Sequence, residues 1–389
     1  MLKSLGRANR VLMLALFVFA LSDGLWFNLR QLYLADLGAT ASQVGLALSA
    51  ASLAGAMVPI PAGYLSDRCG PKTVILLPWA MAAIGTLVMS VAPSWRLATV
   101  GLVVYTLCVG ANPALVSFVL HNLPSAGTAM SSELALTTVF GVYPLTLVAA
   151  PAIGGAIASR AGLRTALVLA TLGFGLAVLI LSTARSRGTT LHGTAHDGHT
   201  LDRNRGFLVL VAYFTVALVT LYVGYVLVPN YLQQVRGYTE SLVGVLFSVL
   251  YMGTVAYNAL TGRVSPRVGF AAVLLGPWLA MLVLWQIPSL PATCVAFALL
   301  GGISTTWPLM QASIDRVVEP DKRGMALGVI EMCTRLGAAA ASATAGQLYD
   351  LSPKHDLPFQ LAVAAIPLVL LIWLLLPKRY LTHDDTPMP

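Results

Sequence analysis

Charged side chains are scarce in this chain of 389 residues, and their scarcity decides the solvent in which the chain folds. Lys, Arg, Asp and Glu together make up 10% of the residues, whereas a soluble domain carries about 25%. Hydrophobic residues reach 57%, and the mean hydropathy is +0.80. These proportions exclude an ordinary soluble protein and predict an integral membrane protein.

Cysteines and catalytic motifs are also few. The four cysteines have no paired spacing, so neither a disulfide framework nor a metal cluster is predicted; they are Cys69, Cys108, Cys294 and Cys333. No Gly-rich Lys-Ser/Thr loop for a nucleotide is present, and no Ser/His/Asp or metal-dyad spacing rises above chance. The sequence therefore predicts no enzyme and no cofactor. We attribute the net charge of +8 to the orientation of the chain in the membrane and not to nucleic-acid binding.

Long apolar runs recur along the whole chain, and in lipid they must be helices because every backbone group has to be paired internally. We expect an all-α protein with twelve spans near 11–34, 42–64, 73–92, 96–119, 128–156, 163–183, 207–230, 241–262, 271–288, 292–313, 324–348 and 358–377. The domains expected are an N-terminal six-helix bundle over 1–183, a polar linker over 184–206 and a C-terminal bundle over 207–389. Lys and Arg collect on one side, which predicts both termini in the cytoplasm and a location in the cell membrane.

The chain repeats itself at an offset of 199 residues. Fourteen identities without a gap relate residues 38–79 to the second half, and they include Gly38 with Gly237, Gly45 with Gly244 and Ser49 with Ser248. Two matching halves in the same orientation are typical of transporters whose halves move about a central site.

The segment Gly63-Tyr64-Leu65-Ser66-Asp67-Arg68-Cys69-Gly70-Pro71-Lys72 resembles the signature loop of the major facilitator superfamily. The resemblance covers nearly the entire chain, and it departs from the pattern in that Pro71 stands where a basic residue is usual. It implies a conformational latch made by Gly63, Asp67, Arg68, Gly70 and Lys72. In the second copy Pro266 replaces the acid, so the latch would be carried mainly by Asp67; ordinary positive-inside charge in a turn is the alternative.

The fifth expected helix holds Ala150-Pro151-Ala152-Ile153-Gly154-Gly155. This stretch resembles one carried by the drug and proton antiporters of the same superfamily, except that Ala150 replaces a Gly. Pro151, Gly154 and Gly155 are therefore expected to form a helix-packing motif, which favours export. Small residues beside a proline also pack helices closely whatever the cargo.

Ionisable residues inside spans are expensive to bury and indicate a functional site or a static pair. Asp23 lies near the middle of the first span, and Arg30 follows two turns later. Glu331 and Arg335 form an i, i+4 pair in the eleventh span, and Glu133 occupies nearly the matching place in the fifth. We expect Asp23, with Glu331 and Glu133 as further candidates, to carry coupling protons. A fixed charge pair is the alternative for Asp23 and Glu331.

The resemblance implies that helices one, four, seven and ten line the substrate cavity. The polar and aromatic residues expected there are Trp26, Asn28, Arg30, Tyr105, Asn112, Tyr222, Tyr225, Trp307 and Gln311, with Arg335 as an anion contact. Tyr and Trp also anchor helices at the membrane interface. The linker histidines His192, His196 and His199 could hold a metal, but a solvated linker is the prediction, so no metal is expected.

These patterns predict a secondary transporter that works by alternating access as a monomer, with a small molecule, protons and the lipid bilayer as partners. Proton-coupled efflux of a lipophilic or cationic compound is the leading hypothesis. Proton-coupled uptake of a sugar, organic acid or other metabolite remains open, as do facilitated diffusion and a receptor or scaffold that no longer transports.

Overall fold

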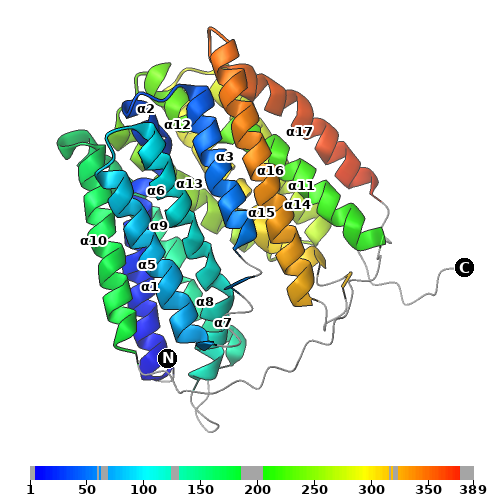
Figure 1. Ribbon diagram of the computed structural model, residues 1–389. Coiled ribbons are helices and arrows are strands. Elements are labelled where there is room, and N and C mark those ends of the chain that lie inside the picture. Colours follow the sequence, from blue (N-terminus) through cyan, green and yellow to red (C-terminus); the bar gives the residue numbers. More distant parts are fainter. Residues whose placement is uncertain are drawn as a thin grey trace, which may run out of the picture. The chain divides into compact units, whose positions relative to one another are not determined.

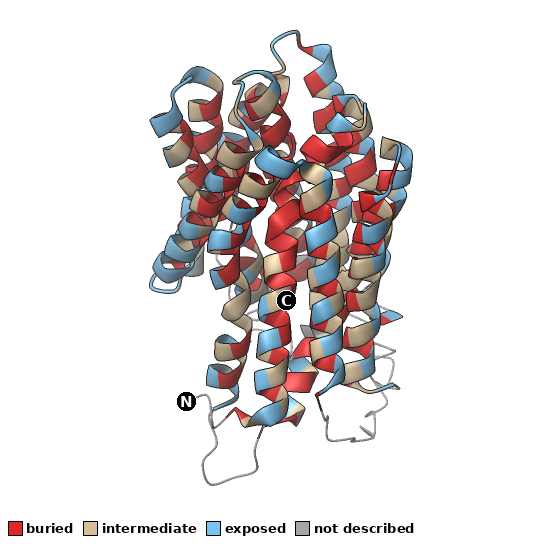
Figure 2. Cartoon of the chain, turned by 90° about the vertical axis from the view of Figure 1, so that its left-hand side faces the viewer, coloured by how far each residue is buried: buried red, intermediate tan, exposed pale blue. Residues whose placement is uncertain are grey.

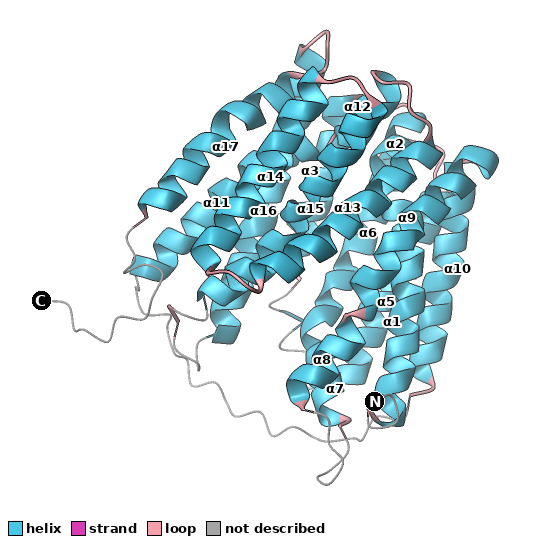
Figure 3. Ribbon diagram, turned by 180° about the vertical axis from the view of Figure 1, so that it is seen from behind, coloured by secondary structure: helices cyan, strands magenta, loops and turns pink. Residues whose placement is uncertain are grey.

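The structure is a computed structural model that describes residues 5–58, 61–62, 69–123, 131–184, 205–314, 317–318 and 323–376. The described residues contain helices and no strand (Figure 1, Figure 3). They divide into two compact units. Unit 1 comprises Met1–Thr40, Ala50–Thr194 and Leu232–Ser248, and unit 2 comprises Ala41–Ser49, Ala195–Tyr231 and Val249–Pro389.

Unit 1 is built mainly from the first half of the chain. Its elements are α1 (Gly6–Trp26), η1 (Phe27–Leu29), α2 (Arg30–Asp36), α5 (Pro71–Ser90), α6 (Trp95–Thr106), η2 (Leu107–Ala111), α7 (Asn112–His121), α8 (Ser132–Phe140), α9 (Val142–Ala161) and α10 (Leu163–Ser182). The helices that contribute residues to both units are α3 (Ala41–Met57), α12 (Val228–Gln234) and α13 (Glu240–Thr261).

Unit 2 is built mainly from the second half. Its elements are α11 (Arg205–Tyr225), α14 (Pro266–Gln286), α15 (Leu290–Ile314), α16 (Arg323–Leu351) and α17 (Leu357–Leu375). Helices α16 and α17 are joined by a turn in which His355 has a φ of 55°.

In the described part of the chain, helical stretches correspond to each of the twelve predicted spans. Ten of these stretches are long and apolar enough to cross a membrane, and the apolar helix α3 is shorter. Helix α16 supplies the eleventh span and is less apolar than the others, because it is rich in alanine and in polar side chains. The all-α prediction with twelve spans is confirmed. The first span extends over Gly6–Asp36, beyond the expected 11–34, because η1 continues α1 directly into α2.

The same packing pattern occurs in both units. Helix α1 packs against α9 and α10, and α5 packs against α6 and α10. In unit 2, α11 packs against α16 and α17, and α14 packs against α15 and α17. Helices at corresponding positions in the two halves of the chain therefore pack against corresponding partners, as expected from the internal repeat.

Glycines at equivalent positions of the repeat meet the same structural requirement in both halves. Gly38 and Gly237 both adopt a positive φ, 86° and 68°, which side chains with a Cβ rarely tolerate. A Cβ on Gly45 would lie 2.3 Å from the Ser342 carbonyl oxygen in unit 2, and a Cβ on Gly244 would lie 2.3 Å from the Pro151 carbonyl oxygen in unit 1. The repeat therefore preserves two tight turns and two close helix crossings.

Each helix has a buried face and an exposed face (Figure 2). The exposed faces carry large apolar side chains; Leu145, Leu172 and Leu179 are all more than 60% exposed. An apolar surface of this kind would drive association in water. In a bilayer it meets lipid tails, so the burial pattern is that of a protein embedded in a membrane.

Helix α9 crosses α1 at a contact made of small residues. A Cβ on Gly154 would lie 2.0 Å from the Leu25 carbonyl oxygen, and a Cβ on Gly24 would lie 2.4 Å from the Ala150 Cβ. Helices approach this closely in membranes when glycine and alanine line the contact. On its next residue, Gly155, α9 meets α13 at Glu240 and Gly244. The motif residues therefore face two different helices.

We predict that Gly154→Ala destabilises the protein, because the added methyl group collides with the backbone of α1, and overpacking of this kind costs about 1–3 kcal/mol. Gly175→Ala is the matched control, because a Cβ at that position of α10 meets nothing within 4 Å. Thermal unfolding of the detergent-solubilised protein should show a lower Tm for Gly154→Ala alone. Equal Tm values for the two variants would contradict the close crossing.

The turn between α16 and α17 contains a carboxylate that holds three segments together. Asp356 Oδ1 accepts a hydrogen bond from Ser352 Oγ at 2.8 Å, and Oδ2 accepts one from Trp285 Nε1 at 3.1 Å. Burial raises the pKa of Asp356, but hydrogen bonds from Ser352, Gln360 and Trp285 outweigh burial and lower the pKa below its ordinary value of 3.8.

A lowered pKa means that Asp356 contributes stability above its unfolded-state pKa, and that this contribution is lost as the pH falls through the folded-state value below 3.8. We therefore predict that Asp356→Asn lowers the Tm at pH 7. The difference from the unsubstituted protein should shrink below pH 4. A Tm difference that is the same at pH 7 and pH 3 would show that the charge of Asp356 has no part in it.

Candidate functional site

Asp23 is the centre of a buried polar cluster in unit 1. It lies on α1 and is 5% exposed. Its Oδ1 accepts a hydrogen bond from the Tyr105 hydroxyl on α6, and its Oδ2 accepts one from the Tyr143 hydroxyl on α9 at 2.5 Å. Both carboxylate oxygens are thus occupied, and one side chain links three helices.

Each of the three helices is interrupted close to this cluster. Segment η1 begins four residues after Asp23, and η2 begins two residues after Tyr105. Helices α8 and α9 meet at Gly141, two residues before Tyr143. Stretches of 3₁₀ helix within a longer helix often mark hinges. The carboxylate therefore lies where three helices can bend.

Aromatic rings surround the cluster. The Trp26 ring stands edge-on to the Tyr105 ring with centroids 4.7 Å apart, and Phe174 lies 5.9 Å from Tyr105. Phe19 in turn lies 4.8 Å from Phe174 and is stacked on Trp79 at 4.6 Å. These rings keep water away from the carboxylate, and hydrogen bonds are stronger in such a low-dielectric environment.

Arg30 is anchored one helical turn beyond the cluster. Its guanidinium carbon lies 3.6 Å from the centroid of the Phe27 ring, and its Nη1 donates to the Phe27 carbonyl oxygen at 2.5 Å. The cation is therefore fixed at the helix interruption η1. Its charge also acts on Asp23 through space.

The other residues expected in the substrate cavity have different environments. In unit 1, Asn28 is 4% exposed, whereas Asn112 is exposed at the start of α7. In unit 2, the half-buried Tyr222 and Tyr225 on α11 lie edge to face with centroids 6.0 Å apart. Trp307 and Gln311 on α15 are also half-buried. Trp26 and Tyr105 thus lie at the Asp23 cluster. The other four of these residues belong to unit 2.

A cavity in unit 2 is lined in part by α15, the helix that carries Trp307 and Gln311. It has a volume of about 440 Å³ and is lined by Asn258, Thr261, Gly262, Val264, Pro308, Leu309 and Ala312. Its lining residues on α15 are Pro308, Leu309 and Ala312, and neither Trp307 nor Gln311 is among them. A cavity of this size suits a small molecule, and its lining is mostly apolar. The residues expected on helix ten did not include these neighbours, because small and apolar residues carry no signal in a single sequence.

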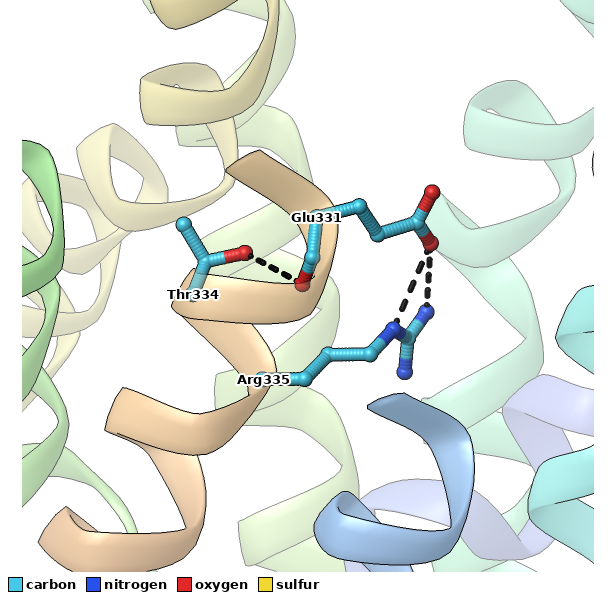
Figure 4. A network of polar contacts seen from close by, with 3 residues as sticks. All are labelled: Glu331, Thr334 and Arg335. Atoms are coloured by element: carbon cyan, nitrogen blue, oxygen red, sulfur yellow. Dashed lines mark hydrogen bonds and ion pairs between the residues drawn. The ribbon is translucent and has the colours of Figure 1, made fainter. Parts of the chain in front are cut away.

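Glu331 and Arg335 form the ion pair that their spacing predicts (Figure 4). Arg335 Nη2 lies 2.9 Å from Glu331 Oε1. The Glu331 side chain is 21% exposed and the Arg335 side chain 25%. Thr334 Oγ1 also donates to the Glu331 carbonyl oxygen at 3.0 Å. The side chain of the third candidate, Glu133 on α8, lies outside the described residues.

Only part of the expected latch is described. Gly63, Asp67 and Arg68 lie outside the described residues, as do the linker histidines. Gly70 precedes α5 with a φ of 77°. Lys72 Nζ donates to the carbonyl oxygens of Ser182 and Ala184 at 2.7 and 2.6 Å. Lys72 therefore caps the end of α10, which is a favourable place for a cation.

Tyr143 was missing from the expected site. Its one signal in the sequence is that Tyr143, Leu147, Ala150 and Gly154 follow the four-three-four spacing of one helix face. Leu147 and Ala150 meet Gly24 on α1, and Gly154 meets Leu25. Tyr143 continues this α1-facing stripe, and its hydroxyl reaches Asp23. The sequence alone did not show which face of α9 meets α1.

The fold is that of known solved transporters. It is similar to a mutant of the nucleoside transporter NupG, with a TM-score of 0.82 and 11% identity over 95% of this chain and 99% of that one. It is also similar to a POT family transporter in complex with 5-aminolevulinic acid, with a TM-score of 0.76 and 13% identity over 96% of this chain and 96% of that one. A third similar structure is the human organic anion transporter MFSD10, with a TM-score of 0.69 and 16% identity over 94% of this chain and 99% of that one. No curated protein matches the sequence.

The apolar helices and the repeated packing define a multi-pass membrane protein, and the match to the family of secondary transporters identifies the chain as one of them. The sequence profile of the Major Facilitator Superfamily matches residues 11–274 and 209–389. The chain belongs to the Major Facilitator Superfamily.

We predict that Tyr143→Phe lowers stability at neutral pH, because it removes one hydrogen bond to a buried charge, which is worth about 1.5–3 kcal/mol. Tyr213→Phe is the matched control. The Tyr213 hydroxyl is also buried but donates to an uncharged group, the Val369 carbonyl oxygen, at 3.1 Å. Thermal unfolding at pH 7 should show the larger loss for Tyr143→Phe; the reverse order would mean that Asp23 is uncharged there.

Proposed function

We propose that this transporter is coupled to protons and that Asp23 binds the coupling proton. The carboxylate held by two phenols is the observation that carries the proposal. Ionised, Asp23 accepts both O–H bonds, and charge-assisted bonds of this kind are roughly twice as strong as neutral ones. Protonated, one of its oxygens carries a hydrogen, so at least one tyrosine contact reverses its direction or weakens to a bond between neutral groups.

This rearrangement has a mechanical consequence. The ionised carboxylate ties α1 to α6 and α9, and protonation loosens these ties next to the three helix interruptions. A proton can shift a conformational equilibrium only by its difference in affinity between two states. Because the tyrosine contacts exist in one state of the carboxylate and change in the other, they supply that difference. Alternating access would then follow the charge of Asp23.

The cargo that fits best is a moderately apolar small molecule, exported in exchange for protons. The cavity of about 440 Å³ in unit 2 supports an apolar cargo. Arg30 is committed to Phe27 and Arg335 to Glu331, so the two arginines that could have bound an organic acid already have partners. The alternative of organic-acid uptake is correspondingly less well supported. A lipophilic or cationic compound remains the leading proposal.

The remaining assignments complete the proposal. Glu331, paired with Arg335, is a second candidate for protonation, and Glu133 is a third. Asp67 and its neighbours act as a latch at the turn before α5. Both termini lie in the cytoplasm, the two bundles cover 1–183 and 207–389, and the protein works in the cell membrane as a monomer.

We predict that Asp23→Asn abolishes proton-coupled transport, because the amide cannot exchange a proton while its size is unchanged. Proteoliposomes with a trapped pH dye and an acidic lumen measure this directly. Adding tetraphenylphosphonium, rhodamine 6G, a sugar or an organic acid outside should alkalinise the lumen for an exchanged cargo. Proton flux that persists in Asp23→Asn would remove Asp23 from the coupling step.

The matched control is Asp36→Asn. Asp36 lies on the same chain segment, at the end of α2, but is exposed. Its substitution should leave cargo-dependent proton flux unchanged. Cargo movement without any proton movement in the unsubstituted protein would make the chain a facilitator, and proton movement in the same direction as the cargo would make it a symporter.

A further inference from the structure

Two helix crossings in this chain are built alike. In unit 2 the start of α3 crosses α16, and a Cβ on Gly45 would lie 3.1 Å from the Gly346 Cα. In unit 1 the start of α13 crosses α9, and a Cβ on Gly244 would lie 3.0 Å from the Gly155 Cα. Because Gly45 and Gly244 are partners in the internal repeat, the two crossings are equivalent positions of the two halves of the chain.

Each crossing involves a helix that is divided between the units. Residues Ala41–Ser49 of α3 belong to unit 2, whereas α3 continues in unit 1 from Ala50. The start of α13, within Leu232–Ser248, belongs to unit 1, whereas α13 continues in unit 2. These helices are the second and eighth spans, so both begin on the side of the membrane opposite the N-terminus. A divided helix cannot follow both units when the units move, so one of its contacts has to open.

An acid marks the crossing in unit 2. Asp350 Oδ2 on α16 accepts a hydrogen bond from the Ser42 N–H of α3 at 2.8 Å, and Ser42 Oγ donates to the Gly346 carbonyl oxygen at 3.3 Å. The first N–H groups of a helix have no acceptor within the helix and lie at the positive end of its dipole. A carboxylate is therefore a favourable partner for the start of α3, and here it comes from another helix.

The equivalent position in unit 1 carries no acid. Gly155 of α9 corresponds to Gly346 of α16 in the two crossings, so Ser159 stands four residues later where α16 has Asp350. The Ser159 hydroxyl donates to the Ala156 carbonyl oxygen of its own helix at 3.2 Å. The repeat has therefore kept the close approach of the backbones at both crossings and placed a carboxylate on one of them.

The crossing in unit 1 has an acid at another position. Glu240 begins α13, and its Oε1 accepts a hydrogen bond from Gln233 Nε2 of the preceding helix α12 at 2.7 Å. Between α9 and α13, the Ala152 N–H donates to Ser248 Oγ at 3.2 Å, which is a bond between uncharged groups. The carboxylate of Glu240 is thus bound close to it in the chain, whereas that of Asp350 joins two distant helices.

We propose that Asp350 is a positioning residue that locks the crossing of α3 with α16. A charge-assisted hydrogen bond is roughly twice as strong as a neutral one, so this crossing opens less readily than its counterpart in unit 1. The inference rests on the alternating-access part of the proposed function. The side of the membrane on which α3 begins opens when the bond from Ser42 to Asp350 breaks, and Asp350 thereby sets how often that side opens.

The test is hydrogen–deuterium exchange of the full chain in detergent, measured by mass spectrometry. Asp350→Ala should speed the exchange of residues 41–49 about fivefold, the size expected for the loss of one capping bond. It should also speed exchange at residues 240–248, the start of α13, because alternating access opens both crossings together. Faster exchange at 41–49 alone would make Asp350 a local helix cap, and unchanged exchange at 41–49 would refute the bond. Either result would overturn the lock.

Glu240→Ala is the matched control, because it removes the acid of the other crossing, whose carboxylate is bound by Gln233. It should leave exchange at residues 41–49 unchanged, and a rise equal to that of Asp350→Ala would contradict the assignment. Asp350→Asn keeps the size of the side chain and an oxygen that can accept the bond, so its rise should be the smaller one. A rise as large as that of Asp350→Ala would show that the amide oxygen does not replace the carboxylate, which also supports a lock that depends on charge.

Asp23→Asn separates the lock from proton coupling. This substitution should abolish cargo-dependent proton flux, whereas the effect of Asp350→Ala on exchange should be the same with Asp23 or Asn at position 23. Exchange therefore tests the lock and proton flux tests the coupling, so either proposal can fail without the other.

Discussion

The carboxyl group of Asp23, buried in the interior of a membrane protein, is the constraint on which the rest of unit 1 depends. An acid near the middle of a bilayer costs about 2.5–3.5 kcal/mol even on lenient insertion scales. Two phenol donors offset that cost, and they come from two other helices, α6 and α9. Helices α1, α6 and α9 must therefore stay in register at this level as long as both hydrogen bonds persist. The aromatic shell of Trp26, Phe174 and Phe19 serves the same end by excluding water.

The small residues of α9 bring α9 into close contact with α13 as well as with α1. Gly154 fits against Leu25 of α1, and the adjacent Gly155 fits against Glu240 and Gly244 of α13. The Ala152 N–H also donates to Ser248 Oγ on α13 at 3.2 Å. Helix α13 begins in unit 1 and ends in unit 2. Helix α9 therefore touches α1 at Leu25 through Gly154 and α13 through the adjacent Gly155, and α13 contributes residues to both units.

Much of the fold could be predicted from residue patterns, because lipid leaves few choices. Apolar length, the scarcity of charge and the repeat at 199 residues sufficed for twelve helices and for two similarly packed units. The predicted ends of the spans were less accurate where the helices are interrupted. The expectation for the fifth span did not include the break at Gly141, since a single glycine inside an apolar run is equally consistent with an unbroken helix. Asp23 was identifiable because it is an isolated acid in an apolar span, whereas Tyr143 was not, because tyrosines are common in membrane helices for other reasons.

By itself the sequence determined that this is a membrane protein, its helical class, its internal duplication, its family resemblance and the presence of Asp23, Glu331 and Arg335 as ionisable residues inside apolar helices. These follow from composition and from spacing along one helix, which are local properties. Only the tertiary structure decided that Asp23 is held by Tyr105 and Tyr143, that Lys72 caps α10 and that the Trp26 N–H is buried without a partner among the described residues. Such facts depend on which faces of different helices meet. That choice is made by side-chain packing between segments far apart in the chain, and no local pattern encodes it.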